Sequence, residues 1–163
     1  MNTTAKHLRS TKSTIRSLSI VHFALCTGII LFGAMAYFNT EKAVLNFSET
    51  EDIFFYLVPA FAIVLTIINH FLFQNNLKRV KAKTTLKDKL THYYTIKIIQ
   101  FALIDGPAIF GIAIFLITSN QYYIIISMLL LAYLILLRPT TNSIKDDLNL
   151  NASESREFRE AIQ

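Results

Sequence analysis

The sequence has little of several residue types, and each scarcity excludes a class of protein. It has one cysteine in 163 residues, Cys26, which excludes a disulfide framework within the chain and a cysteine-based zinc site. Three prolines and four glycines exclude collagen-like and linker-like character. Only 17% of the residues are charged and 53% are hydrophobic, whereas a soluble domain is about 25% charged. These proportions argue against a soluble enzyme and against a disordered chain.

Four long apolar runs account for the high hydrophobic content. They cover residues 18–38, 53–73, 98–118 and 122–137. The first three have about the 20 residues that a helix needs to cross ~30 Å of hydrocarbon, and polar residues flank the shorter fourth run. Runs that are apolar on all sides, in a chain too short for a large core, predict membrane spans. The predicted fold is therefore an all-α integral membrane protein with four transmembrane helices in a single membrane domain, residues 1–163.

The charges between the runs predict how the spans are oriented. Basic residues dominate the N-terminal segment 1–17 and the loop 74–97, a charged tail occupies 138–163, and the loop between the first two runs is acidic. Positively charged loops stay on the cytoplasmic side, so both termini are predicted to be cytoplasmic. The residues behind this pattern are Lys6, Arg9, Lys12 and Arg16 on the basic side, and Glu41, Glu49, Glu51 and Asp52 on the acidic side.

The basic loop also suggests a partner. Its cations flank a predicted span, so anionic lipid headgroups are a nearer partner than nucleic acid, and we expect no nucleic-acid binding. The residues expected to contact anionic lipid are Lys78, Arg79, Lys81, Lys83, Lys87 and Lys89.

The first and third runs share a pattern that predicts an internal duplication. Both read FAL..G...FG, in residues 23–33 and 101–111. Such a repeat predicts two helical hairpins in the same orientation, with spans one and three as the inner helices. Small residues would let those helices approach closely, although they could instead only relieve crowding against large neighbours. The small residues are Ala24, Gly28, Gly33, Ala102, Gly106 and Gly111.

Asp105 is the one carboxylate inside a predicted span. An unpaired charge there costs about 2.5–3.5 kcal/mol, so we expect it to be neutral, paired or facing water. Pro107 follows it, and Pro59 lies in the second span; both predict helix kinks. A polar layer of Asp105, His22, Asn69, His70 and Gln100 is expected at similar depth, either as a structural hydrogen-bonded cluster or as an ion site.

The sequence shows no catalytic set, and it predicts a non-enzymatic protein. His22 and Cys26 are too few ligands for a metal, so neither a metal nor a cofactor is expected. Phosphate-loop, GxSxG and HExxH motifs are absent. The favoured hypothesis is an accessory or scaffold subunit of a membrane complex, with itself or another membrane protein as partner. The alternative is oligomeric proton or ion translocation that uses Asp105.

Two resemblances add to this interpretation. Residues 102–111, ALIDGPAIFG, locally resemble the acidic helix of rotary ATPase proteolipid subunits, although those subunits are rich in glycine. Residues 102–120, with LILLRPTTNSIKDDL at 134–148, resemble a group of small bacterial four-span membrane proteins without known activity. The second resemblance covers nearly the whole chain. It implies a multi-pass protein of the bacterial cytoplasmic (inner) membrane and transfers no catalytic residue.

Overall fold

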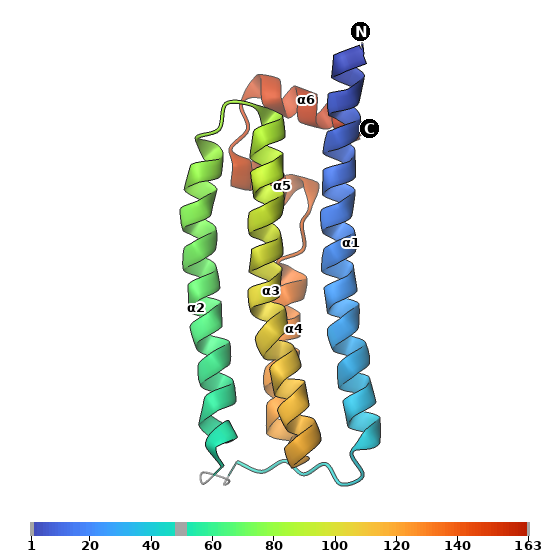
Figure 1. The fold of residues 1–163 in the computed structure, drawn as a ribbon, viewed down its shortest axis with the longest axis vertical. Helices are drawn as coiled ribbons and strands as arrows, with labels where there is room; N and C mark the ends of the chain where they lie inside the picture. Colours follow the sequence, from blue (N-terminus) through green and yellow to red (C-terminus); the bar gives the residue numbers. More distant parts are fainter. Residues whose placement is uncertain (1, 48–51, 163) are drawn as a thin grey trace. The chain divides into compact units, whose positions relative to one another are not determined.

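The structure is a computed structural model that describes residues 2–47 and 52–162, with the backbone alone for residues 2–11. Glu49 and Glu51, used above to orient the spans, lie outside the described residues, as do the side chains of Lys6 and Arg9. The described chain is all-helical, as predicted (Figure 1). Its six helices are α1 (Asn2–Asn39), α2 (Ile53–Lys81), α3 (Leu86–Thr118), α4 (Gln121–Leu136), α5 (Thr141–Leu148) and α6 (Ala152–Ile162).

The apolar runs fall within the first four helices. Among the described residues, α1, α2 and α3 are each long and apolar enough to cross a membrane, and α4 adds a fourth if it counts with α5 as one broken span. The helices α1, α2 and α3 extend beyond the runs into the basic segments. Both α2 and α3 continue as helix through their internal prolines, Pro59 and Pro107.

The chain divides into two compact units. The basic unit consists of Met1–His22, Phe71–Ile99 and Arg138–Gln163. The apolar unit consists of Phe23–His70 and Gln100–Leu137. The helices α1, α2 and α3 each contribute residues to both units.

In the apolar unit, α3 packs against the other three helices. Phe115 stacks on Tyr37 of α1 with ring centroids 6.5 Å apart, and Phe110 meets Phe61 of α2 edge-on at 5.5 Å. Gly111 faces Ser127 of α4. In the membrane-length apolar stretch of each helix, 44% is buried in α3, against 22% in α1 and 17% in α2. Thus α3 is an inner helix as expected, whereas α1 exposes most of its apolar length.

The non-basic ends of these helices are joined by a buried asparagine. The Asn120 side chain donates to the carbonyl of Asn46 at 2.8 Å and accepts from the Asn46 amide at 3.2 Å. The same carbonyl oxygen of the side chain caps α4 by accepting from the Tyr122 amide at 3.0 Å. Beside it, the backbone of Val44 bonds to Ser119 and Gln121. Val44 and Asn46, which follow α1, are therefore fixed to the turn between α3 and α4.

In the basic unit, the tail forms two short capped helices. Thr140 and Ser143 make a reciprocal capping box at the start of α5. Asn151 caps α6 through a 2.8 Å bond from the Glu154 amide to its side chain. The apolar sides of both helices are buried, through Ile144, Leu148 and Phe158. The described part of the tail is thus folded into two packed helices.

Candidate functional site

Asp105 lies on α3 in the apolar unit, and its side chain is half-buried. It has no hydrogen bond or ion pair with any residue in the described part of the chain. Its neighbours Ala102 and Gly106 are exposed, and a Cβ added to Gly106 would meet nothing within 4 Å. A carboxyl within an apolar helix therefore lies beside exposed small residues of the same helix.

The equivalent residues of α1 also face outward. Ala24 and Gly28 are exposed, and a Cβ on Gly28 would likewise meet nothing within 4 Å. Between them in sequence, Cys26 is buried. We define the acidic face as Asp105 together with the exposed small residues Ala102 and Gly106 of α3.

The other two glycines do pack within the apolar unit. A Cβ on Gly33 would lie 3.6 Å from Ile112 of α3. A Cβ on Gly111 would collide with the Ser127 hydroxyl and lie 3.2 Å from the Tyr123 carbonyl oxygen of α4. The repeat thus contains one open and one packed glycine in each half. Its first aromatic positions differ, because Phe23 is 72% exposed and Phe101 is fully buried.

The residues of the expected polar layer have unlike surroundings. His22, Asn69 and Gln100 are buried, whereas His70 is exposed. The side-chain amide nitrogen of Asn69 has no hydrogen-bond partner among the described residues, although the residue is only 1% exposed. His70 is therefore exposed, whereas three residues of the expected layer are buried and Asp105 is half-buried.

The basic residues of the loop also divide into two groups. Five of the six are exposed: Lys78, Arg79, Lys81, Lys83 and Lys87. Lys89 is buried instead, and its Nζ donates to both carboxylate oxygens of Glu154 at 2.7 and 2.9 Å. Lys89 therefore fastens α6 to α3.

A second buried contact lies further along α3. The Tyr93 hydroxyl donates to Asp147 of α5 at 2.6 Å, and Lys97 Nζ lies 3.7 Å from the same carboxylate. Lys97 Nζ also lies 4.6 Å from the centre of the Phe73 ring of α2, a cation–π contact. We define the tail clamp as Lys89, Tyr93 and Lys97 with their partners Glu154 and Asp147. The sequence shows each residue but not these pairings.

The tail clamp changes the acidity of Glu154. Burial raises the pKa of this carboxyl, but the hydrogen bonds from Lys89 and the Asn151 amide, with the Lys89 charge, outweigh burial and hold the pKa below its usual 4.5. A lowered pKa in the folded state means that ionised Glu154 stabilises the clamp above the ordinary pKa. That contribution is lost as the pH falls through the lowered value.

We therefore expect α6 to loosen in acid. Hydrogen exchange of the α6 amides, corrected for the intrinsic rate, should accelerate as the pH falls below about 4.5. Glu154→Gln should flatten this pH dependence, because the substituted residue does not titrate. Glu157→Gln, at an exposed position of the same helix, should leave it unchanged. An unaltered profile in Glu154→Gln would show that another group controls the loosening.

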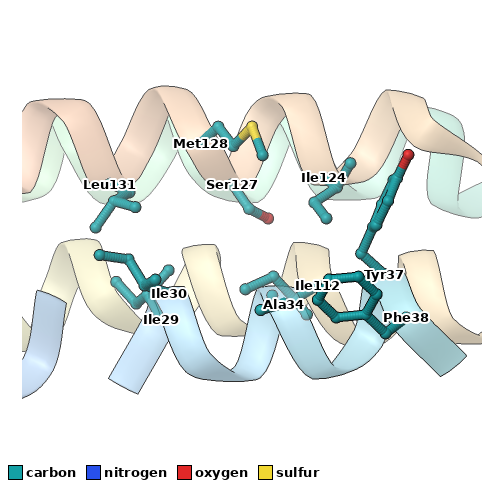
Figure 2. Close-up of a pocket in the computed structure, with 11 residues that line it drawn as sticks. Ile29, Ile30, Ala34, Tyr37, Phe38, Ile112, Ile124, Ser127, Met128 and Leu131 are labelled. Carbon is teal, nitrogen blue, oxygen red and sulfur yellow. The ribbon is translucent and has the colours of Figure 1, made fainter. Parts of the chain in front are cut away.

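An apolar groove lies in the apolar unit between α1, α3 and α4, with a volume of about 370 Å³. Figure 2 shows the Ser127 hydroxyl directed into it, with Tyr37 and Phe38 at one end. The remaining lining is aliphatic apart from Met128. This groove suits hydrocarbon and offers little polar chemistry.

The chain has no match among known protein families, curated proteins or solved structures. Within residues 2–47 and 52–162, no group of three or more histidine, cysteine or acidic side chains could hold a metal ion. The class of protein that the helices define is an all-helical one with three to four segments able to cross a membrane.

Proposed function

We propose that this chain is a multi-pass protein of the bacterial cytoplasmic membrane, with both termini in the cytoplasm, and that it acts as a non-enzymatic accessory or scaffold subunit. The basic segments at one end of three apolar helices support the orientation. The five exposed cations of the loop would rest on anionic headgroups there. The partner is a helix of another membrane protein or of a second copy of this chain.

The acidic face is the observation that carries the proposal. Asp105 is half-exposed within an apolar helix and has no hydrogen bond from the described residues, which is costly against lipid. A partner helix with a polar or basic group would satisfy it. Ala102 and Gly106, four residues apart and both exposed, allow such a helix to approach closely. The small residues predicted to pack helices would then do so between chains.

A leucine on the acidic face should remove the partner. We expect Ala102→Leu to reduce the co-purified partner in mild detergent by about tenfold, because overpacking a close contact costs about 1–3 kcal/mol. The matched control is Ala60→Leu, at an exposed position of α2, which should leave recovery unchanged. Quantitative mass spectrometry measures another protein, and two differently tagged copies measure self-association.

Three results would contradict the proposal. One is a strictly monomeric wild-type protein that retains no partner. Another is equal loss of partner in Ala102→Leu and Ala60→Leu. The third is an undiminished partner in Ala102→Leu, which would place the interface elsewhere on the molecule.

The Asp105 carboxyl also supports a second candidate function, translocation of protons or ions by an oligomer. Asp105 is the single acid within the apolar runs, and the buried Pro107 follows it on α3. We expect Asp105→Asn to lower proton flux into proteoliposomes to the level of empty liposomes, while Glu41→Gln, exposed and outside the spans, retains it. Equal flux from wild type and Asp105→Asn would remove this candidate and leave the accessory role standing.

A further inference from the structure

A second, polar groove lies in the basic unit between α1 and α3. Its volume is about 220 Å³ and all six residues that line it carry a hydroxyl: Ser13, Thr14, Ser17, Thr91, Tyr94 and Thr95. No acidic side chain lines it. We call this the hydroxyl groove, and it shares no lining residue with the acidic face or with the six cations named in the basic loop.

Three of these hydroxyls are available to a ligand. Thr91 and Thr95 already donate to backbone carbonyls of α3, at 3.0 and 3.3 Å. Ser13, Ser17 and Tyr94 make no hydrogen bond to any residue that the structure describes. They come from two helices and line one hollow. A ligand that accepts several hydrogen bonds at once would fit them best.

Cations flank the groove on both helices. Arg16 lies three residues from Ser13 and Lys87 four residues from Thr91, spacings that make side chains neighbours on a helix. Both are exposed, and neither has an ion pair within the described chain. The nearby acid, Asp88, is bonded to Thr85 at 2.8 Å. Hydroxyl donors between free cations favour a phosphate group, which accepts hydrogen bonds and carries negative charge.

The position of the groove along the helices indicates where that phosphate comes from. Ser17 directly precedes the apolar run that begins at Leu18, and Thr95 lies three residues before the run that begins at Ile98. The groove is therefore at the level where the helices leave hydrocarbon and lipid headgroups begin. We propose that the hydroxyl groove binds the phosphate group of an anionic phospholipid. This inference rests on the proposed membrane location, but not on a protein partner.

Native mass spectrometry of the full chain in neutral detergent tests it, with phosphatidylglycerol, phosphatidylcholine and inorganic phosphate as probes. Phosphatidylglycerol should bind more tightly than phosphatidylcholine. Ser13→Ala/Ser17→Ala and Arg16→Gln should each weaken phosphatidylglycerol binding by about tenfold, the effect of losing a hydrogen bond to a charged group. The matched controls, Ser19→Ala on α1 and Arg156→Gln on α6, are exposed, lie outside the groove and the basic loop, and should bind as wild type does. Far-ultraviolet circular dichroism confirms that each variant is folded.

Each alternative outcome would overturn the inference. Equal weakening by Arg16→Gln and Arg156→Gln, with no effect of the double serine variant, would show general attraction to positive charge. Equal binding of phosphatidylcholine would show that the negative charge is not recognised. Binding of inorganic phosphate without phosphatidylglycerol would make the ligand a soluble phosphate. None of these outcomes bears on co-purification of a partner, so this inference and the accessory role fail separately.

Discussion

Lys89→Met is expected to release α6 from α3 and to destabilise the tail by about 3–5 kcal/mol, because it leaves the Glu154 carboxylate buried without its cation. The Lys89 and Glu154 side chains are only 9% and 10% exposed. The expected readouts are faster hydrogen exchange and new proteolytic cleavage in residues 152–162. The spans should remain folded, because this contact lies within the basic unit.

A double substitution shows whether the loss in Lys89→Met comes from the unpaired Glu154 carboxylate or from the missing ion pair itself. Replacing a buried ion pair by apolar side chains of similar volume is often neutral, so Lys89→Met/Glu154→Leu should regain most of the stability. Recovery should be incomplete, because Glu154 also accepts from the Asn151 amide at 3.0 Å. Lys87→Met, at an exposed position on the same helix, is the control and should have no effect. If Lys89→Met and Lys87→Met behaved alike, α6 would not depend on the clamp.

Gly111→Ala is expected to destabilise the apolar unit by about 1–3 kcal/mol, because the new methyl group would meet the Ser127 hydroxyl and the Tyr123 carbonyl of α4. The carbonyl is backbone and cannot turn away. Gly106→Ala should be neutral or stabilising by up to about 1 kcal/mol, since no atom lies within 4 Å and alanine favours helix. Thermal unfolding of the two purified variants in detergent provides the comparison.

Removing the Ser127 hydroxyl should restore part of the stability that Gly111→Ala loses. Gly111→Ala/Ser127→Ala relieves the nearest contact but not the one with Tyr123, so its midpoint should lie between those of Gly111→Ala and wild type. A lower midpoint in Gly106→Ala than in Gly111→Ala would mean that α3 presents the opposite side to α4.

The sequence predicted the helices well because their signals are local. Apolar runs predicted four helical segments. The cap of α3 is equally local, because the Asp88 amide bonds to the Thr85 hydroxyl at 3.2 Å. At the start of α6, the Asn151 side chain likewise accepts from the Glu154 amide three residues on. Such boundaries depend on caps and composition within a few residues.

The orientation of the small residues could not be predicted in the same way. Helices α1 and α3 are apolar on all sides within the spans, so no periodicity separates the side that packs from the side that faces lipid. Ala102 and Gly106 are exposed, whereas Gly111 on the same helix is packed. The tail clamp was missed for a different reason, since Lys89 and Glu154 are 65 residues apart and no local pattern joins them.

The most direct test of the central claim asks whether protein or lipid covers the acidic face in the native membrane. A photo-crosslinking amino acid placed at Gly106, with an identical one at Ala60 of α2, gives that comparison at two exposed positions. We expect a discrete crosslinked band from position 106, containing this chain and one partner, and none from position 60. Crosslinks to lipid alone from both positions would contradict the account.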